Sequence, residues 1–267
     1  MIDIHSHLLP GFDDGPRTIE ESLEICRIAA EDGVTALVAS PHHLNGVYRN
    51  EREKILEGVH LMKECIAQEG LSFEVYPGSE VQLDGSIVFE QKNGRIATLN
   101  DGGKFLLVEL PRFFSKEVVL DQIHELKHLG VVPIISHPER SQAIVEEIDL
   151  AYLMIREGAL MQLTAASILG KAGRGPQRIA SLMLERRMAH FVASDAHGAE
   201  IRPPGLSLAF NKVVALVGQL EALRIFYTNP EAVIEGQIPF LPSVIMPEPK
   251  KKGYLERLSQ MFKKGGS

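Results

Sequence analysis

Short, mainly apolar runs alternate along this chain with longer stretches in which apolar residues recur at helical spacing. Uninterrupted apolar runs of this kind are typical of strands that are buried on both faces of a parallel sheet. The runs, which predict seven parallel strands, lie at 2–4, 36–39, 73–76, 105–108, 131–135, 159–163 and 190–193.

The stretches between these runs predict amphipathic helices that cross from one strand to the next. Thr18 and Glu21 have the spacing of a capping box and predict the start of the first helix, while Gly33 predicts its end. The remaining helices are predicted at 51–69, 116–129, 142–157, 176–188, 206–218 and 219–227.

Strand–helix alternation over most of the chain predicts a parallel sheet with right-handed crossovers. Seven strands favour an α/β barrel, complete or distorted, over an open doubly wound sheet, and a chain of 267 residues is long enough to close one. The barrel is predicted to form a single domain at 1–240, which is followed by a Pro/Lys-rich tail at 241–267.

Composition narrows the class of protein further. With 45% hydrophobic and 24% charged residues the chain has the balance of a globular protein, and its net charge of −7 argues against a general nucleic-acid partner. We expect no transmembrane helix, because no apolar run reaches about 18 residues, and no signal peptide at the start. Two cysteines, Cys26 and Cys65, fit a reducing cytoplasm better than a disulfide framework.

Side chains that can bind metal ions follow six of the seven predicted strands. In a parallel barrel the carboxyl ends of the strands meet on one face, so these side chains are expected to converge there. His5 and His7 are two apart and point to the same side if extended, as do Asp195 and His197. The nine candidates are His5, His7, Asp14, His42, Glu80, Glu109, His137, Asp195 and His197.

The donor set indicates the kind of metal centre. Imidazoles mixed with carboxylates suit zinc, manganese or iron(II). Nine ligands exceed the need of one ion, so two or three ions that share bridging carboxylates fit better, and such a centre can activate water and bind phosphoryl oxygens. Each motif alone is weak, since an isolated His-x-His is more often polar surface or a buried pair. Their joint pattern predicts a metal site.

Several stretches of the chain resemble one family. They are "IDIHSHLLPGFDDGPRT", "ASPHH", "GSEV", "LLVELP", "ISHPER", "SILGKAGR" and "ASDAHGAEIRPP", in family order from residue 1 to about 240. Together they resemble the PHP (polymerase and histidinol phosphatase) family, and within it the bacterial tyrosine-protein phosphatases of capsular-polysaccharide operons, the CpsB/CapC type. This resemblance implies a distorted (β/α)7-type, TIM-like barrel, the PHP fold, with a trinuclear metal centre.

The resemblance also implies how the ligands are shared. The ions in this family are usually manganese, iron, or a mixture with zinc or magnesium, and we expect manganese. The implied ligands are His5, His7, Glu80 and Asp195 for one ion, Glu80, Glu109 and His137 for a second, and Asp14, His42 and His197 for a third.

Two arginines stand close to these ligands in the sequence. Arg140 and Arg202 could be ordinary surface charges, but each follows a ligand motif closely enough to overhang the metal face. Guanidinium groups bind phosphate oxygens bidentately and stabilise the charge of a transferring phosphoryl group. The resemblance implies that both bind the substrate phosphate. Asp13 is predicted to support the site through a turn rather than to bind metal, and the role of His43 is left open.

These observations predict a metal-dependent protein-tyrosine phosphatase. A cysteine-dependent enzyme needs Cys-x5-Arg, but Asp32 and Leu71 stand six residues after the two cysteines. By resemblance, the substrate is expected to be an autophosphorylated bacterial tyrosine kinase that regulates capsule or exopolysaccharide synthesis. Two alternatives stay open: a histidinol-phosphate or other small-molecule phosphoesterase, and a non-catalytic, metal-stabilised module that docks a kinase. An amidohydrolase is disfavoured, because glutamates stand where it needs a metal-bridging lysine.

The tail contains six basic and two acidic residues. Within it, apolar residues between 254 and 262 recur at near-helical spacing among lysines. A basic amphipathic helix of this kind would touch an anionic membrane surface, at its inner face, or an acidic partner. The alternative, which the pattern favours slightly, is a disordered solubilising tail.

Overall fold

The computed structural model describes residues 1–245; the predictions for the tail beyond residue 245 lie outside the described residues. Each predicted strand coincides with an observed strand, with ends that differ by no more than two residues. The strands are β1 Ile2–Ser6, β2 Ala36–Ala39, β3 His42–His43, β4 Glu74–Pro77, β5 Glu80–Gln82, β6 Phe105–Glu109, β7 Val132–Ser136, β8 Leu160–Thr164 and β9 Phe191–Ala193.

All strand pairs are parallel, in the orders β1-β2-β4 and β3-β5-β6-β7-β8-β9. The two sheets are continuous in space, because β3 follows β2 after a break at Pro41, and β5 follows β4 after a break at Gly78. At Gly78 a Cβ atom would lie 2.7 Å from the side chain of Val38, which explains the glycine there.

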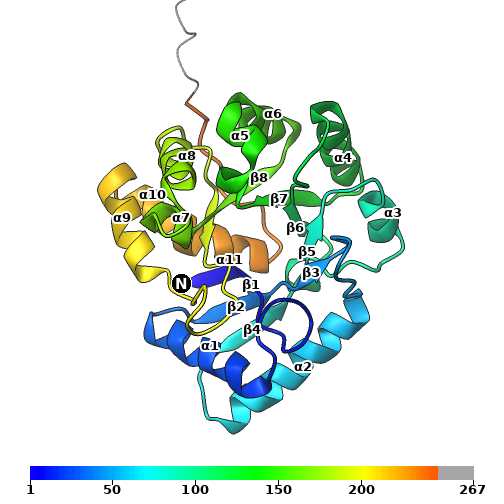
Figure 1. Ribbon diagram of the computed structural model, residues 1–267, viewed down its shortest axis with the longest axis vertical. Coiled ribbons are helices and arrows are strands. Elements are labelled where there is room, and N and C mark those ends of the chain that lie inside the picture. Colours follow the sequence, from blue (N-terminus) through cyan, green and yellow to red (C-terminus); the bar gives the residue numbers. More distant parts are fainter. Residues whose placement is uncertain (246–267) are drawn as a thin grey trace, which may run out of the picture.

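The barrel closes between its first and last strands. The amide of Asp195 donates to the carbonyl of His5 at 3.0 Å, and that of His7 donates to the carbonyl of Ala196 at 2.8 Å. Seven strand positions therefore surround a closed centre, with helices outside (Figure 1). The predicted α/β barrel of TIM-like type is confirmed.

The helices cover the outside of the barrel and one of its ends. They are α1 Ile19–Glu31, α2 Arg52–Gln68, α3 Ile87–Lys92, α4 Lys116–His128, α5 Gln142–Glu146, α6 Asp149–Glu157, α7 Ala165–Leu169, α8 Arg174–Glu185, α9 Ser207–Val217, α10 Gln219–Leu223 and α11 Asn229–Ile234, with short turns η1 Leu99–Asp101, η2 Pro138–Arg140 and η3 Arg224–Thr228.

The cap predicted for α1 is present. The hydroxyl of Thr18 accepts from the amide of Glu21 at 3.3 Å, and Gly33 takes a left-handed conformation with φ 85° after the helix ends. The reciprocal half of the capping box differs, because the carboxylate of Glu21 accepts from the amide of Arg17 instead of Thr18. One side chain thus caps α1 and the other tightens the loop before it.

Two predicted helices were wrong in their extent. The helix expected at 142–157 is two helices, α5 and α6, because Glu147 leaves the helical region with φ −133° and ψ 87°. The helix expected at 219–227 is α10 followed by the π-helical turn η3, which runs on into α11. Continuous helical periodicity across both stretches concealed these breaks.

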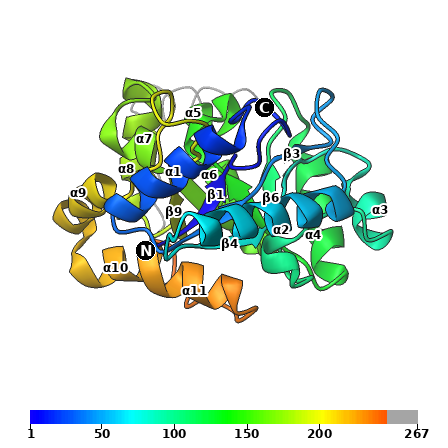
Figure 2. The ribbon, with the colours of Figure 1, turned by 90° about the horizontal axis from the view of Figure 1, so that it is seen from below.

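The core has an outer layer between strands and helices and an inner one within the barrel. Phe105 and Phe191 fill the inner layer, and Val233 of α11 packs against it. Figure 2 shows α10 and α11 beneath the end of the barrel where the strands begin. The opposite end, where the strands finish, is therefore the open one and carries the polar residues.

Among residues 1–245, no helix is both long enough and apolar enough to span a membrane.

Candidate metal centre

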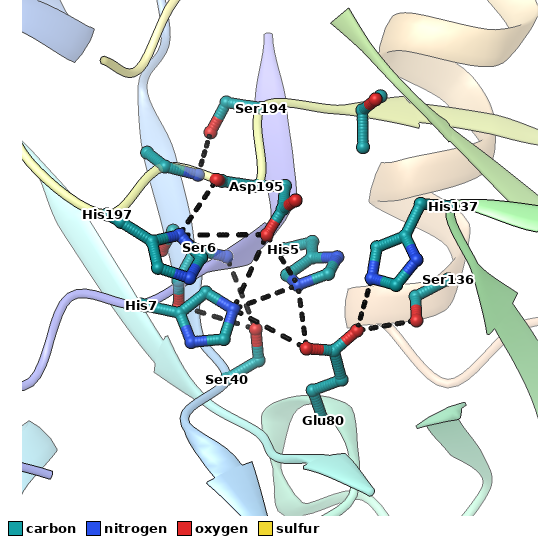
Figure 3. A network of polar contacts seen from close by, with 12 residues as sticks. His5, Ser6, His7, Ser40, Glu80, Ser136, His137, Ser194, Asp195 and His197 are labelled. Atoms are coloured by element: carbon teal, nitrogen blue, oxygen red, sulfur yellow. Dashed lines mark hydrogen bonds and ion pairs between the residues drawn. The ribbon is translucent and has the colours of Figure 1, made fainter. Parts of the chain in front are cut away.

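The nine predicted ligands all lie at the carboxyl end of the barrel. Figure 3 shows the side chains of His5, His7, Glu80 and Asp195 directed toward one another. The register between β1 and β2 shifts between Asp3 and Ser6, in the part of β1 that holds His5. Bulges of this kind turn side chains next to active sites. The ligands lie as follows: His5 in β1, His7 and Asp14 in the loop after it, His42 in β3, Glu80 in β5, Glu109 at the end of β6, His137 directly after β7, and Asp195 and His197 after β9.

Four buried side chains form the tightest group. Nε2 of His5 lies 3.2 Å from Nε2 of His7, 3.4 Å from Oε2 of Glu80 and 3.3 Å from Oδ1 of Asp195. Nε2 of His7 lies 3.5 and 3.4 Å from the same two oxygens. A tetrahedral ion with ligands at about 2.1 Å holds them about 3.4 Å apart, so these distances suit one divalent ion.

One oxygen of each carboxylate in this group has no hydrogen-bond partner among residues 1–245. Oε2 of Glu80 and Oδ1 of Asp195 are buried and face imidazoles, but neither accepts a hydrogen bond; Nδ1 of His42, 3.1 Å from Oε2 of Glu80, makes none either. Buried polar atoms without partners are costly, and buried carboxylates are normally paired or bind a metal. The donor set, its spacing and these unpaired atoms therefore all fit metal ions.

Two further groups share members with the first. His42, Glu80 and Glu109 offer atoms within 4.8 Å of one another, and Nε2 of His137 lies 2.9 Å from Oε1 of Glu80 and 3.8 Å from Oε1 of Glu109. The structure thus brings the expected second set together and adds His42 to it. A third group contains the expected set with His7 added, within the same limit: His7, Asp14, His42 and His197.

Several residues hold the ligands in place from behind. Nδ1 of His7 lies 2.6 Å from Oδ2 of Asp13, which leaves Nε2 directed at the centre. Nδ1 of His5 lies 2.8 Å from Oε1 of Gln162 in β8. The hydroxyl of Ser136 donates to Oε1 of Glu80. Sequence reasoning missed Gln162, although an amide inside the apolar run 159–163 is a signal for a buried polar role.

The two arginines meet at Asp195. Nη1 of Arg140 donates to Oδ2 of Asp195 at 2.7 Å, and Nη2 of Arg202 donates to the same oxygen. Nη1 of Arg202 also lies 2.8 Å from Nε2 of His197. Both guanidinium groups, which are partly exposed, therefore overhang the ligand groups.

Arg140 has a second contact that the sequence did not reveal. Its Nη2 donates to the hydroxyl of Thr164 at 3.0 Å, and that hydroxyl lies 2.9 Å from Oε1 of the fully buried Glu139. Oε1 of Glu139 also accepts from the amide of Thr164 at 3.0 Å. The end of β8 therefore fixes the direction of the Arg140 side chain.

The backbone is strained at three residues of the site. His137, Asp195 and Arg202 have φ of 34°, 57° and 57°, a region that side chains other than glycine rarely adopt. Such conformations concentrate at active and ligand-binding sites, where the surrounding structure enforces them. The strain supports a functional role for this end of the barrel.

Interactions between neighbouring carboxyl and imidazole groups shift the pKa values of several predicted ligands. Burial opposes ionisation of Glu80, but the charges of His5 and His137 outweigh it and hold the pKa of this carboxyl well below its usual range. Burial likewise disfavours the charged form of His137, yet the carboxylate of Glu80 raises its pKa to about 9. Burial and then the charge of Glu80 raise the pKa of Glu109.

A cavity of about 930 Å³ opens over the ligands. It is lined by five of the predicted ligands and by both arginines: His42, Glu80, Glu109, His137, Asp195, Arg140 and Arg202. Aromatic and apolar residues of the loop after β6 form another part of its lining: Leu110, Pro111, Phe113 and Phe114. A phosphate monoester with an organic group attached has room here.

Other candidates have structural roles. Nδ1 of His43 accepts from the amide of Asn50, and burial lowers the pKa of His43 to about 4, so it is a neutral buried acceptor. Both cysteines are free, and burial raises the pKa of Cys26 to about 12. Cys26 packs in the outer core, so it is no thiolate nucleophile.

Known proteins are similar in sequence to this chain over most of its length. Residues 1–235 match the family described as capsular polysaccharide synthesis, CpsB/CapC. The chain is 37% identical over 245 residues to the putative tyrosine-protein phosphatase CapC of Staphylococcus aureus, covering 90% of this chain and 95% of the relative. It is 34% identical over 202 residues to the tyrosine-protein phosphatase YwqE of Bacillus subtilis (strain 168), covering 76% and 79%.

Solved structures agree with these relatives. The fold matches a structure from a study of YwqE from Bacillus subtilis and CpsB from Streptococcus pneumoniae, which are described as unique metal-dependent tyrosine phosphatases. The TM-score is 0.86 and the sequence identity is 31%, and the match covers 92% of this chain and 100% of the other. Histidinol phosphate phosphatase from Lactococcus lactis gives 0.55 at 11% identity over 84% and 94%, a likeness of fold alone. This chain belongs to the CpsB/CapC family of capsular polysaccharide synthesis.

Proposed function

We propose that this protein is a metal-dependent protein-tyrosine phosphatase. The observation that carries the proposal is a set of unpaired buried carboxylate oxygens, on Glu80 and Asp195, that lie among imidazoles and beneath two arginines. Relatives at 37% and 34% identity named as tyrosine-protein phosphatases support it. Because neither cysteine stands in a Cys-x5-Arg motif, the nucleophile would be a water whose pKa the bound metal lowers.

We infer three divalent ions, with manganese as the expected metal. Their ligands are the sets His5, His7, Glu80 and Asp195; Glu80, Glu109 and His137; and Asp14, His42 and His197. The carboxylate of Glu80 belongs to two sets, since its two oxygens face different imidazoles. Divalent ions supply Lewis-acid stabilisation and lower the pKa of water.

The chain's own residues bind and orient the substrate. Arg140 and Arg202 present guanidinium forks to the phosphoryl oxygens and stabilise the charge that spreads over them during transfer. Thr164 holds the side chain of Arg140 toward the ligands. Tyrosinate leaves, and its pKa near about 10 makes it a fair leaving group without prior protonation.

The partner we propose is a bacterial tyrosine kinase that has phosphorylated its own tyrosines. The family's description as capsular polysaccharide synthesis supports a role in the regulation of that pathway. We place the reaction in the cytoplasm, where such a kinase domain is phosphorylated and where the two free thiols stay reduced.

The decisive experiment is a substrate and metal panel with the purified protein. Hydrolysis of p-nitrophenyl phosphate and of a phosphotyrosine peptide is expected with Mn²⁺ and should disappear with a chelator. Inactivity with every divalent metal would favour a non-catalytic docking module. A kcat/KM for histidinol phosphate far above that for phosphotyrosine would favour the small-molecule phosphoesterase.

Replacement of Arg202 tests its proposed role in phosphate binding. Arg202→Ala is expected to lower kcat/KM by about 100-fold or more, because a charge-assisted contact to the transferring phosphoryl group is lost. Metal content, measured by inductively coupled plasma mass spectrometry, should not change. Arg156→Ala, an exposed arginine in the last turn of α6, is the control. Loss of metal from Arg202→Ala would contradict the assignment.

A further inference from the structure

The cavity above the ligands has an aromatic side that the phosphate chemistry does not use. Phe113 and Phe114 both line it, in the loop that follows Glu109 at the end of β6. Phe114 packs against the outer core and anchors the loop. The side chain of Phe113, in contrast, remains 84% exposed, so the loop presents a large apolar surface to the cavity and to solvent.

The ring of Phe113 has a cationic neighbour. The guanidinium carbon of Arg112 lies 5.4 Å from the ring centroid of Phe113, within the range of a cation–π contact. Three residues separate Phe113 from Glu109, so the Cα atoms of the two residues lie at most about 14 Å apart. A planar apolar surface therefore lines the same cavity as the predicted ligand Glu109 and stands close to it along the chain.

A second cavity of about 830 Å³, next to the same two arginines, is an alternative place for the organic group of the substrate. It shares Arg140 and Arg202 with the first and is lined by apolar residues that include Leu208. Of the described residues that line it, none is among the nine predicted ligands. The first cavity is lined by five of the predicted ligands and by Phe113, so we expect a group esterified to a phosphate on the ligands to enter that cavity.

We propose that Phe113 is the specificity-determining residue of the site, against which the aromatic ring of the phosphotyrosyl group packs. This inference rests on the proposed phosphatase function. Paired aromatic rings attract one another beyond the apolar area they bury, whereas an alkyl chain gains only that area. The cavity therefore selects aryl over alkyl phosphomonoesters.

Binding of two non-hydrolysable ligands tests this selection directly. The dissociation constants of phenylphosphonate and methylphosphonate are measured by calorimetry on the manganese-loaded protein. Phe113→Ala is expected to weaken phenylphosphonate about tenfold and methylphosphonate less than about twofold. Phe113→Leu keeps apolar area without a ring and should fall between. Phe240→Ala changes an exposed phenylalanine (74% exposed) that lines a different cavity, and it should change neither.

Turnover separates this inference from the proposed function. In Phe113→Ala, KM for phosphotyrosine should rise about tenfold with kcat nearly unchanged, while kcat/KM for glycerol phosphate stays within about twofold. Equal losses for both substrates, or a selective loss in Leu208→Ala instead, would overturn the role of Phe113. A wild-type protein that hydrolyses no phosphotyrosine would overturn the proposed function itself.

Discussion

Glu80 illustrates how densely this site is charged. Its Oε1 contacts Ser136 and His137, while its Oε2 faces His5, His7 and His42 with no hydrogen bond of its own. An ionised carboxylate is expensive to bury unless positive charge surrounds it. Without a metal, protonated imidazoles provide that charge; in our proposal metal ions would provide it instead, because an imidazole binds a metal only in its neutral form.

Thr164 is expected to position Arg140 without touching substrate. In Thr164→Val the hydroxyl that accepts from Nη2 of Arg140 is lost, so kcat should fall by about tenfold while metal content and KM change little. Thr164→Ser keeps the hydroxyl and should restore most of the activity. Steady-state kinetics of the two variants check this; equal activity of both would contradict the positioning role.

Among single residues, the sequence was most informative for residue types that seldom occur at the end of a buried strand without a function. Histidines and carboxylates directly after apolar runs could be recognised, because strand ends converge in a parallel barrel. Gln162, Glu139 and Thr164 could not, since amides, carboxylates and hydroxyls occur throughout loops and strands for many reasons. Their roles depend on which strands come together. The pairing of β7 with β8 brings Glu139 to Thr164, and closure of the barrel brings β8 near β1, where Gln162 contacts His5.

Among the elements, α9 depends on a side chain from the end of α1. The carboxylate of Asp32 accepts from the amides of Leu206 and Ser207 at 2.5 and 2.8 Å, and from the hydroxyl of Ser207. It therefore caps α9 and anchors the loop that carries Arg202. Local sequence signals gave no hint of this cap, because the cap and the helix are more than 170 residues apart.

Removal of this cap should destabilise the protein. Asp32→Ala is expected to lower the free energy of unfolding by about 1–2 kcal/mol, since two helix amides lose their acceptor, and to lower Tm by about 4 °C. Differential scanning fluorimetry measures the shift. Glu31→Ala removes an exposed neighbouring carboxylate and should leave Tm within about 1 °C. Equal shifts in both variants would show that the hydrogen bonds to α9 contribute nothing.

His190 links β8, β9 and α11 as a neutral side chain. Its Nδ1 accepts from the amide of Met161, and its carbonyl accepts from Asn229. Burial, and then the charge of Arg224, lower the pKa of His190 to about 3. The unfolded chain binds a proton near pH 6.5 and the folded one does not, so this residue contributes stability that is lost as the pH falls from about 6.5 to 3.

The pH dependence can be isolated with one variant. His190 contributes a slope of up to about 1.4 kcal/mol per pH unit between pH 3 and 6.5. His190→Asn keeps an acceptor near the Nδ1 position but does not titrate. Urea unfolding at pH 4.5 and 6.5 should therefore give a smaller difference for the variant than for the wild type. Equal differences would indicate that His190 is protonated in the folded state.

The strand pattern could be predicted well and the helix breaks could not. Apolar runs marked every position around the barrel, because a strand buried on both faces has no polar alternation. The breaks at Glu147 and at η3 occur within helical periodicity and reflect packing against neighbouring elements. Both short strands, β3 and β5, carry ligands, and their polar residues hid them from a search for apolar runs.

For the whole molecule, metal ions are expected to act as cross-links. The proposed ligands come from β1, β3, β5, β6 and the segments after β7 and β9, so bound ions join nearly the whole circumference of the barrel. Ligands that bind only the folded state stabilise it by about 2.7 kcal/mol at 100 times their dissociation constant. Chelation should therefore lower Tm by several degrees, about 5 °C or more.

Calorimetry with excess Mn²⁺ and with chelator tests this stabilisation. Glu80→Gln removes the shared carboxylate, and its Tm should respond much less to either treatment. The same Tm for wild-type protein in both solutions would exclude metal binding by the folded state. Recovery of the higher Tm after manganese is added back shows that chelation did not damage the protein.

The closure of the barrel between β1 and the segment after β9 also determines when, during synthesis of the chain, the proposed metal site can be completed. The amide of Ser194 donates to Asp3 across 191 positions, a length that a ribosome takes about 10–40 s to synthesise. Until that segment leaves the exit tunnel, His5 and His7 have no Asp195 beside them. A nascent chain therefore lacks the complete proposed ligand set for most of its synthesis.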